Sequence, residues 1–173
     1  MNEQPSSTRI ALKWGLFLGL ALIAITLVMY LTDQAGNGWF NLLTLVVMVA
    51  FLILAMRDYR TSTGGYMSYG EGFGIGALLS AVGGLLSAAF ITFYNVVIDP
   101  TIQQRAFEQA REKLEEQGKL SDEQIDQALE FSQKFQSPGF TFIAGVFGTL
   151  IFGALLSLII AAFIRRNKTN PFE

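Results

Sequence analysis

The stretch FGIGALLSAVGGLLSAAFITFYNVVI, residues 73–98, determines the fold class of this chain. It is predominantly apolar and contains no Asp, Glu, Lys or Arg. An α-helix rises about 1.5 Å per residue, so about 18 such residues cross the ~30 Å hydrocarbon core of a bilayer. Residues 14–31, 39–56 and 140–164 meet the same criterion. The sequence therefore predicts an all-α integral membrane protein with four transmembrane helices, in a single membrane domain over residues 1–173.

Basic residues concentrate on one side of these four spans. The segments before the first span, after the second and after the fourth together carry seven basic and four acidic residues. The segment 99–139, between the third and fourth spans, carries nine acidic and five basic residues. Short cytoplasmic loops of membrane proteins are enriched in Lys and Arg. We therefore expect cytoplasmic termini, an extracytoplasmic segment 99–139, the lipid bilayer as the environment and no nucleic-acid partner.

Small residues recur at every fourth position of the third and fourth spans. In the third span this series is Gly72, Gly76, Ser80, Gly84 and Ala88. In the fourth span it is Gly145, Thr149, Gly153, Ser157 and Ala161. A shorter series in the first span is Ala11, Gly15 and Gly19.

Such series allow two helix backbones to approach closely, which drives association in a bilayer because lipid tails are as apolar as leucine. We expect the third and fourth spans to be the closest helix pair. A four-residue step overshoots one helical turn by about 40°, so each series winds around its helix and only its middle positions should touch the partner. The predicted helix-packing residues are Gly76, Ser80, Gly84, Gly153 and Ser157.

The segment 99–139 has the pattern of a helical hairpin outside the membrane. Asp99 and Pro100 are suited to the N-cap and first position of a helix, and Gly118 to the position just after its end. Ser121 and Gln124 form a capping box that begins a second helix. Because the third and fourth spans are longer than a bilayer core requires, we expect them to project beyond it and to carry the hairpin as a rigid extension.

Apolar side chains line one side of each predicted hairpin helix. The first helix presents Ile102, Phe107 and Leu114, and the second presents Ile125, Leu129, Phe131 and Phe135. The second set is larger than its partner helix can cover. Phe131 and Phe135 are therefore a candidate interaction surface, which meets either the membrane surface or another protein.

The composition excludes several kinds of active site. The chain has no Cys and no His, which excludes thiolate chemistry, an HExxH zinc site and a Ser–His dyad. The best acidic candidates, Glu71 and Asp99, have structural explanations as helix-capping residues. Tyr94 and Asn95 either bond to neighbouring helices or line a small polar cavity. We expect no catalytic residue, no cofactor and no metal site.

Residues 65–73, GYMSYGEGF, are followed by a glycine-rich span and then by Ile98, Asp99 and Pro100. This arrangement resembles the small four-span proteins, mainly of Bacteroidota, that are catalogued as domain of unknown function 4199. The likeness extends over nearly the whole chain in the number of spans and in the charged insert before the last one. It implies a location in the bacterial inner membrane, and it implies no activity, cofactor or catalytic residue.

Three functions are compatible with these features. The first is a non-enzymatic scaffold or interaction module that contacts a protein partner, or another copy of itself, through the 99–139 hairpin. The second is a small channel or transporter subunit with a path along the glycine-rich third and fourth spans. The third is an enzyme that acts on lipid through Glu71 or Asp99. We favour the first, since the spans contain no charged residue in their interior.

Overall fold

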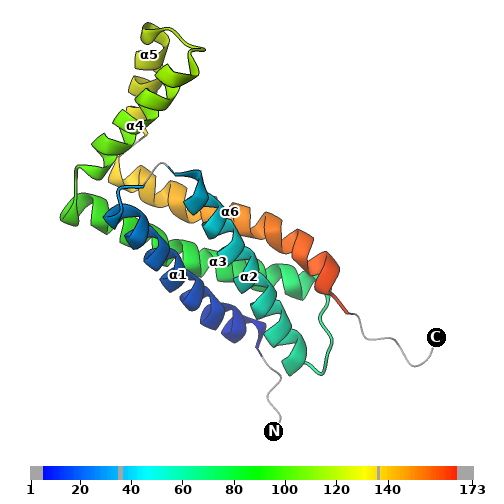
Figure 1. Cartoon of the computed structure of the whole chain (residues 1–173). Coiled ribbons are helices and arrows are strands. Elements are labelled where there is room, and N and C mark those ends of the chain that lie inside the picture. Colours follow the sequence, from blue (N-terminus) through cyan, green and yellow to red (C-terminus); the bar gives the residue numbers. More distant parts are fainter. Residues whose placement is uncertain (1–5, 35–36, 136, 167–173) are drawn as a thin grey trace.

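The computed structural model describes residues 6–34, 37–135 and 137–166 of the chain (Figure 1). Four long helices form a bundle: α1 (Ser7–Leu31), α2 (Gly38–Ser62), α3 (Tyr69–Phe93) and α6 (Pro138–Ile164). Between α3 and α6 lie the π-helical turn η1 (Tyr94–Ile98) and the shorter helices α4 (Ile102–Gln117) and α5 (Asp122–Lys134). All four long helices are long and apolar enough to cross a membrane. The chain is therefore an all-helical, multi-pass membrane protein, as predicted.

The long helices begin earlier than the apolar runs because polar side chains cap their first turns. Asn37 and Ser137 accept hydrogen bonds from the backbone N–H groups of Trp39 and Phe140, and Pro138 occupies the first position of α6. Such caps satisfy donors that the helix itself leaves unpaired. The helices therefore extend beyond the predicted spans by up to one or two turns.

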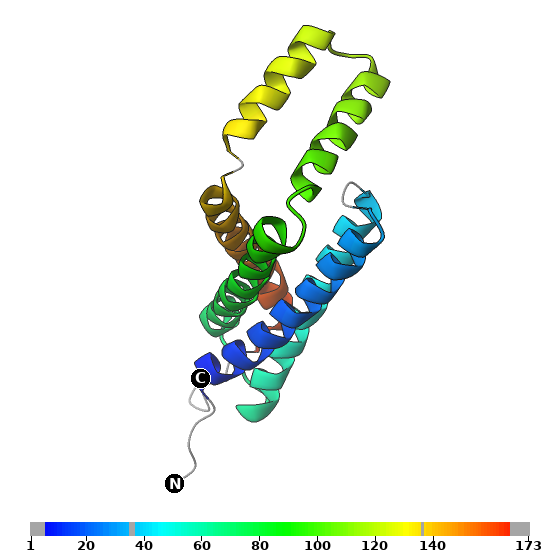
Figure 2. The same cartoon turned by 90° about the vertical axis from the view of Figure 1, so that its left-hand side faces the viewer.

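Helix α3 occupies the centre of the bundle. It packs along most of its length against α6 on one side and α1 on the other, and it is the most buried of the four spans. Helix α2 lies on α1 and joins the core only through its second half, from Met48 to Tyr59. In two perpendicular views α4 and α5 project from one end of the bundle (Figures 1 and 2). The structure thus separates a four-helix membrane body from a two-helix projection, which we call the hairpin.

One prediction about the base of the hairpin is wrong. Asp99 and Pro100 do not begin α4, which starts at Ile102 after a turn. The Asp99 carboxylate instead accepts bonds from the backbone N–H and the hydroxyl of Thr101, a pattern that stabilises a turn. This turn redirects the chain between η1 and α4 (Figure 1). The segment forms two helices that project from the bundle, and its role as a rigid extension of the spans stays a prediction.

The predicted end of α4 and beginning of α5 are confirmed. Gly118 follows α4 with a φ of 60°, a left-handed conformation that glycine adopts without the steric cost of a Cβ atom. Ser121 accepts a hydrogen bond from the backbone N–H of Gln124, whose side chain accepts one from the N–H of Ser121. This reciprocal capping box sets the start of α5.

Candidate functional site

The two small-residue series of α3 and α6 face each other along their full length. A Cβ atom added to Gly76 would lie 2.3 Å from Cβ of Ser157, and one added to Gly153 would lie 1.9 Å from Oγ of Ser80. The five facing pairs are Gly72 with Ala161, Gly76 with Ser157, Ser80 with Gly153, Gly84 with Thr149, and Ala88 with Gly145. The structure thus brings together all five predicted helix-packing residues.

The expectation that only middle positions touch is wrong. From one pair to the next, the residue number rises by four on α3 and falls by four on α6. The two antiparallel series therefore remain in register. The contact extends over about 24 Å, the length of sixteen helical residues. At this separation the two backbones leave no room for a path between them. The small residues therefore act as a structural seam.

A second close approach joins α1 to α3. A Cβ atom added to Gly15 would lie 2.8 Å from Cβ of Val82, and one added to Gly19 would lie 2.8 Å from a methyl carbon of Leu86. The side chain of Leu18 of α1 packs against Gly83 of α3 and is fully buried. The short series in the first span was the signal for this contact.

The end of the bundle that holds the start of α1 and the end of α6 is joined by polar contacts. Asp58 accepts bonds from Nζ of Lys13 at 2.6 Å and from Nε1 of Trp14 at 2.8 Å, which ties α1 to α2. Glu71 forms the predicted capping box with Ser68. It also accepts a bond of 2.8 Å from the hydroxyl of Tyr59. Glu71 therefore links α2 to the first turn of α3, a structural role.

The C-terminal end of α6 also forms polar contacts at this end of the bundle. Arg60 donates a hydrogen bond of 3.1 Å to the carbonyl oxygen of Ile164, the last residue of α6. Met67 and Arg166 exchange two backbone hydrogen bonds, of 3.0 and 2.9 Å, as an isolated antiparallel bridge. The α2–α3 connection is thereby held to the end of the last span.

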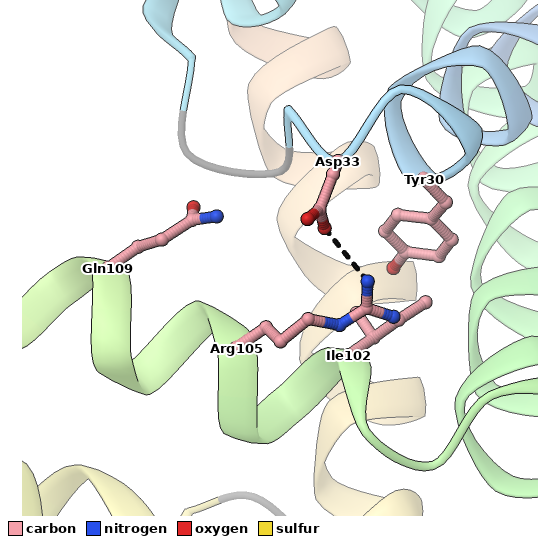
Figure 3. A pocket seen from close by; sticks show the side chains of 5 residues that line it. All are labelled: Tyr30, Asp33, Ile102, Arg105 and Gln109. Atoms are coloured by element: carbon pink, nitrogen blue, oxygen red, sulfur yellow. Dashed lines mark hydrogen bonds and ion pairs between the residues drawn. The ribbon is translucent and has the colours of Figure 1, made fainter.

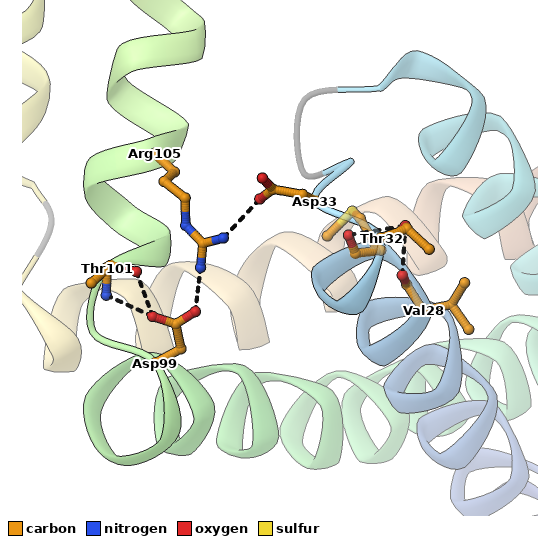
Figure 4. Close-up of polar contacts among 7 residues, drawn as sticks. Val28, Thr32, Asp33, Asp99, Thr101 and Arg105 are labelled. Atoms are coloured by element: carbon orange, nitrogen blue, oxygen red, sulfur yellow. Dashed lines mark hydrogen bonds and ion pairs between the residues drawn. The ribbon is translucent and has the colours of Figure 1, made fainter.

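Arg105 joins the hairpin to the bundle at the opposite end (Figures 3 and 4). Its guanidinium lies between two carboxylates, pairing with Asp33 of the α1–α2 connection at 2.9 Å and with Asp99 at the base of the hairpin. The Thr101 hydroxyl and N–H, together with the Arg105 charge, lower the pKa of Asp99 below its usual range. This bridge was not predicted, because it joins residues that are distant in sequence.

A small pocket of about 10 Å³ lies beside this bridge, with Tyr30, Ile102 and Gln109 also on its walls (Figure 3). It has room for about one water molecule. Tyr94, which sequence analysis placed in a possible polar cavity, is instead buried against the rings of Tyr30 and Phe90. The base of the hairpin therefore contains a packed polar turn. A more open pocket of about 440 Å³ lies next to it, lined by Asp33, Gln34, Asn37, Gly38, Gln109 and Lys113.

The candidate interaction surface consists of exposed aromatic rings. Phe131 and Phe135 are 62% and 43% exposed, and their ring centroids are 5.0 Å apart. Phe135 also contacts Phe140, in the first turn of α6, at 5.3 Å, and Phe140 is 45% exposed. The three rings form a row, the aromatic row, from the hairpin to the start of a membrane span. In contrast, Ile125 is almost fully buried between the hairpin helices.

A cavity of about 700 Å³ lies inside the bundle, in the half nearer to the hairpin. Its walls belong to α1, α2, α3 and α6. Among the residues that the structure describes, no group of three or more acidic side chains is placed to hold a metal ion. This cavity was not predictable from the sequence, because its volume depends on how far the helices diverge.

No curated protein and no solved structure matches this chain. A protein-family model described as "Protein of unknown function (DUF4199)" matches residues 13–166. The match extends from the first span to the residue that pairs with Met67 after the last one, so it includes the bundle, the hairpin and both polar ends. The chain therefore belongs to the DUF4199 family, and this confirms the resemblance found in its sequence.

Proposed function

We propose that this chain is a non-enzymatic protein of the bacterial inner membrane and that its extracytoplasmic hairpin is an interaction module. The observation that carries the proposal is the aromatic row. Phe131 and Phe135 are large apolar side chains that stay exposed outside the four spans, although Ile125 of the same helix is buried. Exposed apolar patches of this kind occur where a protein contacts another protein or a membrane surface.

The proposed orientation follows from charge. Arg9, Lys13, Arg57, Arg60 and Arg165 lie near helix ends at the end of the bundle opposite to the hairpin. Basic residues at span ends favour the cytoplasm. The hairpin carries more acidic than basic residues. We therefore assign the hairpin to the extracytoplasmic side.

Single cysteines test this orientation. Because the chain has no cysteine of its own, the introduced thiol is the only one that a thiol reagent can label in it. Thr8→Cys and Gln117→Cys place one thiol at each end of the molecule, both at exposed positions. In intact spheroplasts an impermeant thiol reagent should label Gln117→Cys and leave Thr8→Cys unlabelled until the membrane is permeabilised. The opposite pattern would reverse the orientation.

The aromatic row is tested by replacing Phe131 and Phe135 together with serine and measuring the size of the complex extracted from native membranes. A smaller complex with unchanged melting of the isolated protein is the expected result. The matched control is Leu120→Ser, an exposed apolar residue at the far end of the hairpin. An unchanged complex would refute the hypothesis that a protein partner binds these rings, and would leave them as contacts with the membrane surface.

The alternative is a channel or transporter subunit with a path along the third and fourth spans. We rank it lower because α3 and α6 touch at all five small-residue pairs. An enzyme acting on lipid through Glu71 or Asp99 is ranked lowest. Both carboxylates are engaged in structural bonds, Glu71 with Ser68 and Tyr59, and Asp99 with Thr101 and Arg105.

A further inference from the structure

The 700 Å³ cavity is formed by the way α2 packs. From Met48 onward α2 carries its buried residues, whereas its first ten residues contribute none. Meanwhile the seam holds α6 close to α3 along its length. The first half of α2 therefore diverges from α6 and leaves the space between four helices. The residues on its walls are Leu22, Thr26, Asn41, Leu42, Thr44, Leu45, Met48, Ser87, Ile91, Gly148, Thr149 and Phe152.

The exposure of these residues shows where the cavity opens. The wall formed by α1 and α3 includes Leu22 and Ser87, which are buried, and Met48 of α2 is buried at the end away from the hairpin. Leu42 of α2 and Phe152 of α6 are each 47% exposed. The opening therefore lies between α2 and α6. Because both helices are membrane spans, it faces the hydrocarbon of the bilayer and not the aqueous phase.

The polar groups on the walls are mostly occupied. Thr26, Thr44 and Thr149 each donate their hydroxyl to a carbonyl oxygen four residues earlier on the same helix, at 2.8 to 2.9 Å. Their hydroxyl donors are thereby used within their own helices. Within the described residues, the side chains of Asn41 and Ser87 form no hydrogen bond. Asn41 lies in the first turn of α2, near the polar boundary, so the cavity has one polar end and a mainly apolar interior.

Water is a poor occupant of this space. Each buried water needs two to four polar partners, and the walls offer few. Because the space opens sideways between two membrane spans, a lipid chain can reach it without crossing the bundle. An elongated apolar molecule with a polar end, supplied by the surrounding bilayer, matches the shape, the opening and the wall chemistry.

We propose that the cavity is a binding site for one acyl chain of a membrane phospholipid. The chain enters laterally between α2 and α6 and lies against Leu22, Met48 and Phe152. The ester region of the lipid lies near the amide of Asn41 at the polar boundary. This site is separate from the hairpin, and it does not depend on the function proposed for the aromatic row.

The test uses a phosphatidylglycerol probe with a photoreactive diazirine in its acyl chain. The full-length protein is reconstituted into vesicles containing the probe and irradiated, and mass spectrometry identifies the labelled residues. The proposal predicts labelling of Leu22, Met48 and Ser87, which lie on the buried walls. Lipid that only surrounds the bundle would label outward-facing residues such as Leu43 and Val46 instead.

A substitution that fills the cavity provides the second measurement. Gly148 is on the cavity wall, and no atom lies within 4 Å of a Cβ added there. Gly148→Phe should therefore fold normally and reduce labelling of the buried walls about tenfold, because the ring displaces the chain. The control is Gly74→Phe, which lies on α3 outside the cavity and is equally open around its Cβ position. Gly74→Phe should leave labelling of the buried walls unchanged.

Three results would overturn the proposal. The first is wild-type labelling confined to outward-facing residues, which requires no variant. The second is undiminished labelling of Ser87 in a Gly148→Phe protein that melts like the wild type. The third is disulfide formation between two copies of a Leu42→Cys variant in the membrane, which would identify a second protomer at the opening as the occupant. If Gly148→Phe fails to fold, Leu42→Trp blocks the same opening from α2 and is judged by the same labelling.

Discussion

The two halves of the bundle are held together in different ways. In the half away from the hairpin, all four helices share one core around Leu18, Leu52 and Leu79, each fully buried, and polar contacts close the end. In the half near the hairpin, α2 separates from α6 and a cavity of about 700 Å³ remains. One arginine, Arg105, connects the hairpin to the α1–α2 connection there.

This difference shows what small residues accomplish in a bilayer. The seam between α3 and α6 runs through both halves, so it cannot by itself explain why only one half is closed. What differs is α2, whose second half provides Met48, Leu52 and Met56 to the core. Close backbone contact sets the positions of three helices, whereas the bulky side chains of the fourth decide where the interior is filled.

The largest expected effect comes from breaking the seam. Gly153→Leu places a side chain where a Cβ atom alone would lie 1.9 Å from Oγ of Ser80 and 2.6 Å from a methyl carbon of Met48. Because the backbone of α6 must move away, we expect the free energy of unfolding to fall by about 3 kcal/mol. Thermal unfolding in detergent measures it. Gly148→Leu on the same helix should melt like the wild type, and equal losses in the two variants would show that the seam is not an interface.

A smaller effect is expected from removing the polar contacts, and it should differ between the two ends of the bundle. Asp58→Ala removes the bonds from Lys13 and Trp14 and should lower bundle stability by about 1 kcal/mol, since the group is partly exposed. Arg105→Ala should leave bundle melting within about 0.5 kcal/mol, because its ion pairs join the base of the hairpin to the α1–α2 connection and do not join the membrane spans to one another. Hydrogen exchange should instead increase in the first turn of α4. A larger loss of melting stability for Arg105→Ala than for Asp58→Ala would contradict the comparison.

The smallest effect is the response of the hairpin base to acid. Asp99 has a lowered pKa because its charged form is bonded to Thr101 and Arg105. Its stabilising contribution is complete above the ordinary aspartate pKa of about 3.9 and is lost as the pH falls through the lower folded value. Spin-label distances between Gln117 and Val46 should therefore be constant from neutral pH to about pH 5 and broaden only below about pH 4. Broadening that begins near pH 6 would implicate another group.

Sequence features with local causes were predictable. The four spans follow from apolar length, and the capping boxes at Ser68 and Ser121 follow from spacing within one helical turn. The facing of α3 and α6 followed from two matched series of small residues. The start of α4 was not predictable in the same way, because the Asp99 carboxylate bonds to Arg105 and Thr101 and supports a turn before the helix.

The amino-acid sequence by itself determined the class of the protein, the number of its spans, the capping boxes that begin α3 and α5, and its membership of the DUF4199 family. These properties depend on residues that are close together in the chain. Only the tertiary structure decided the register of the seam, the pairing of Arg105 with Asp33, the exposure of Phe131 and the cavity beneath the hairpin. Each of these depends on how distant helices are placed, and small changes in helix divergence determine whether side chains meet or leave a space.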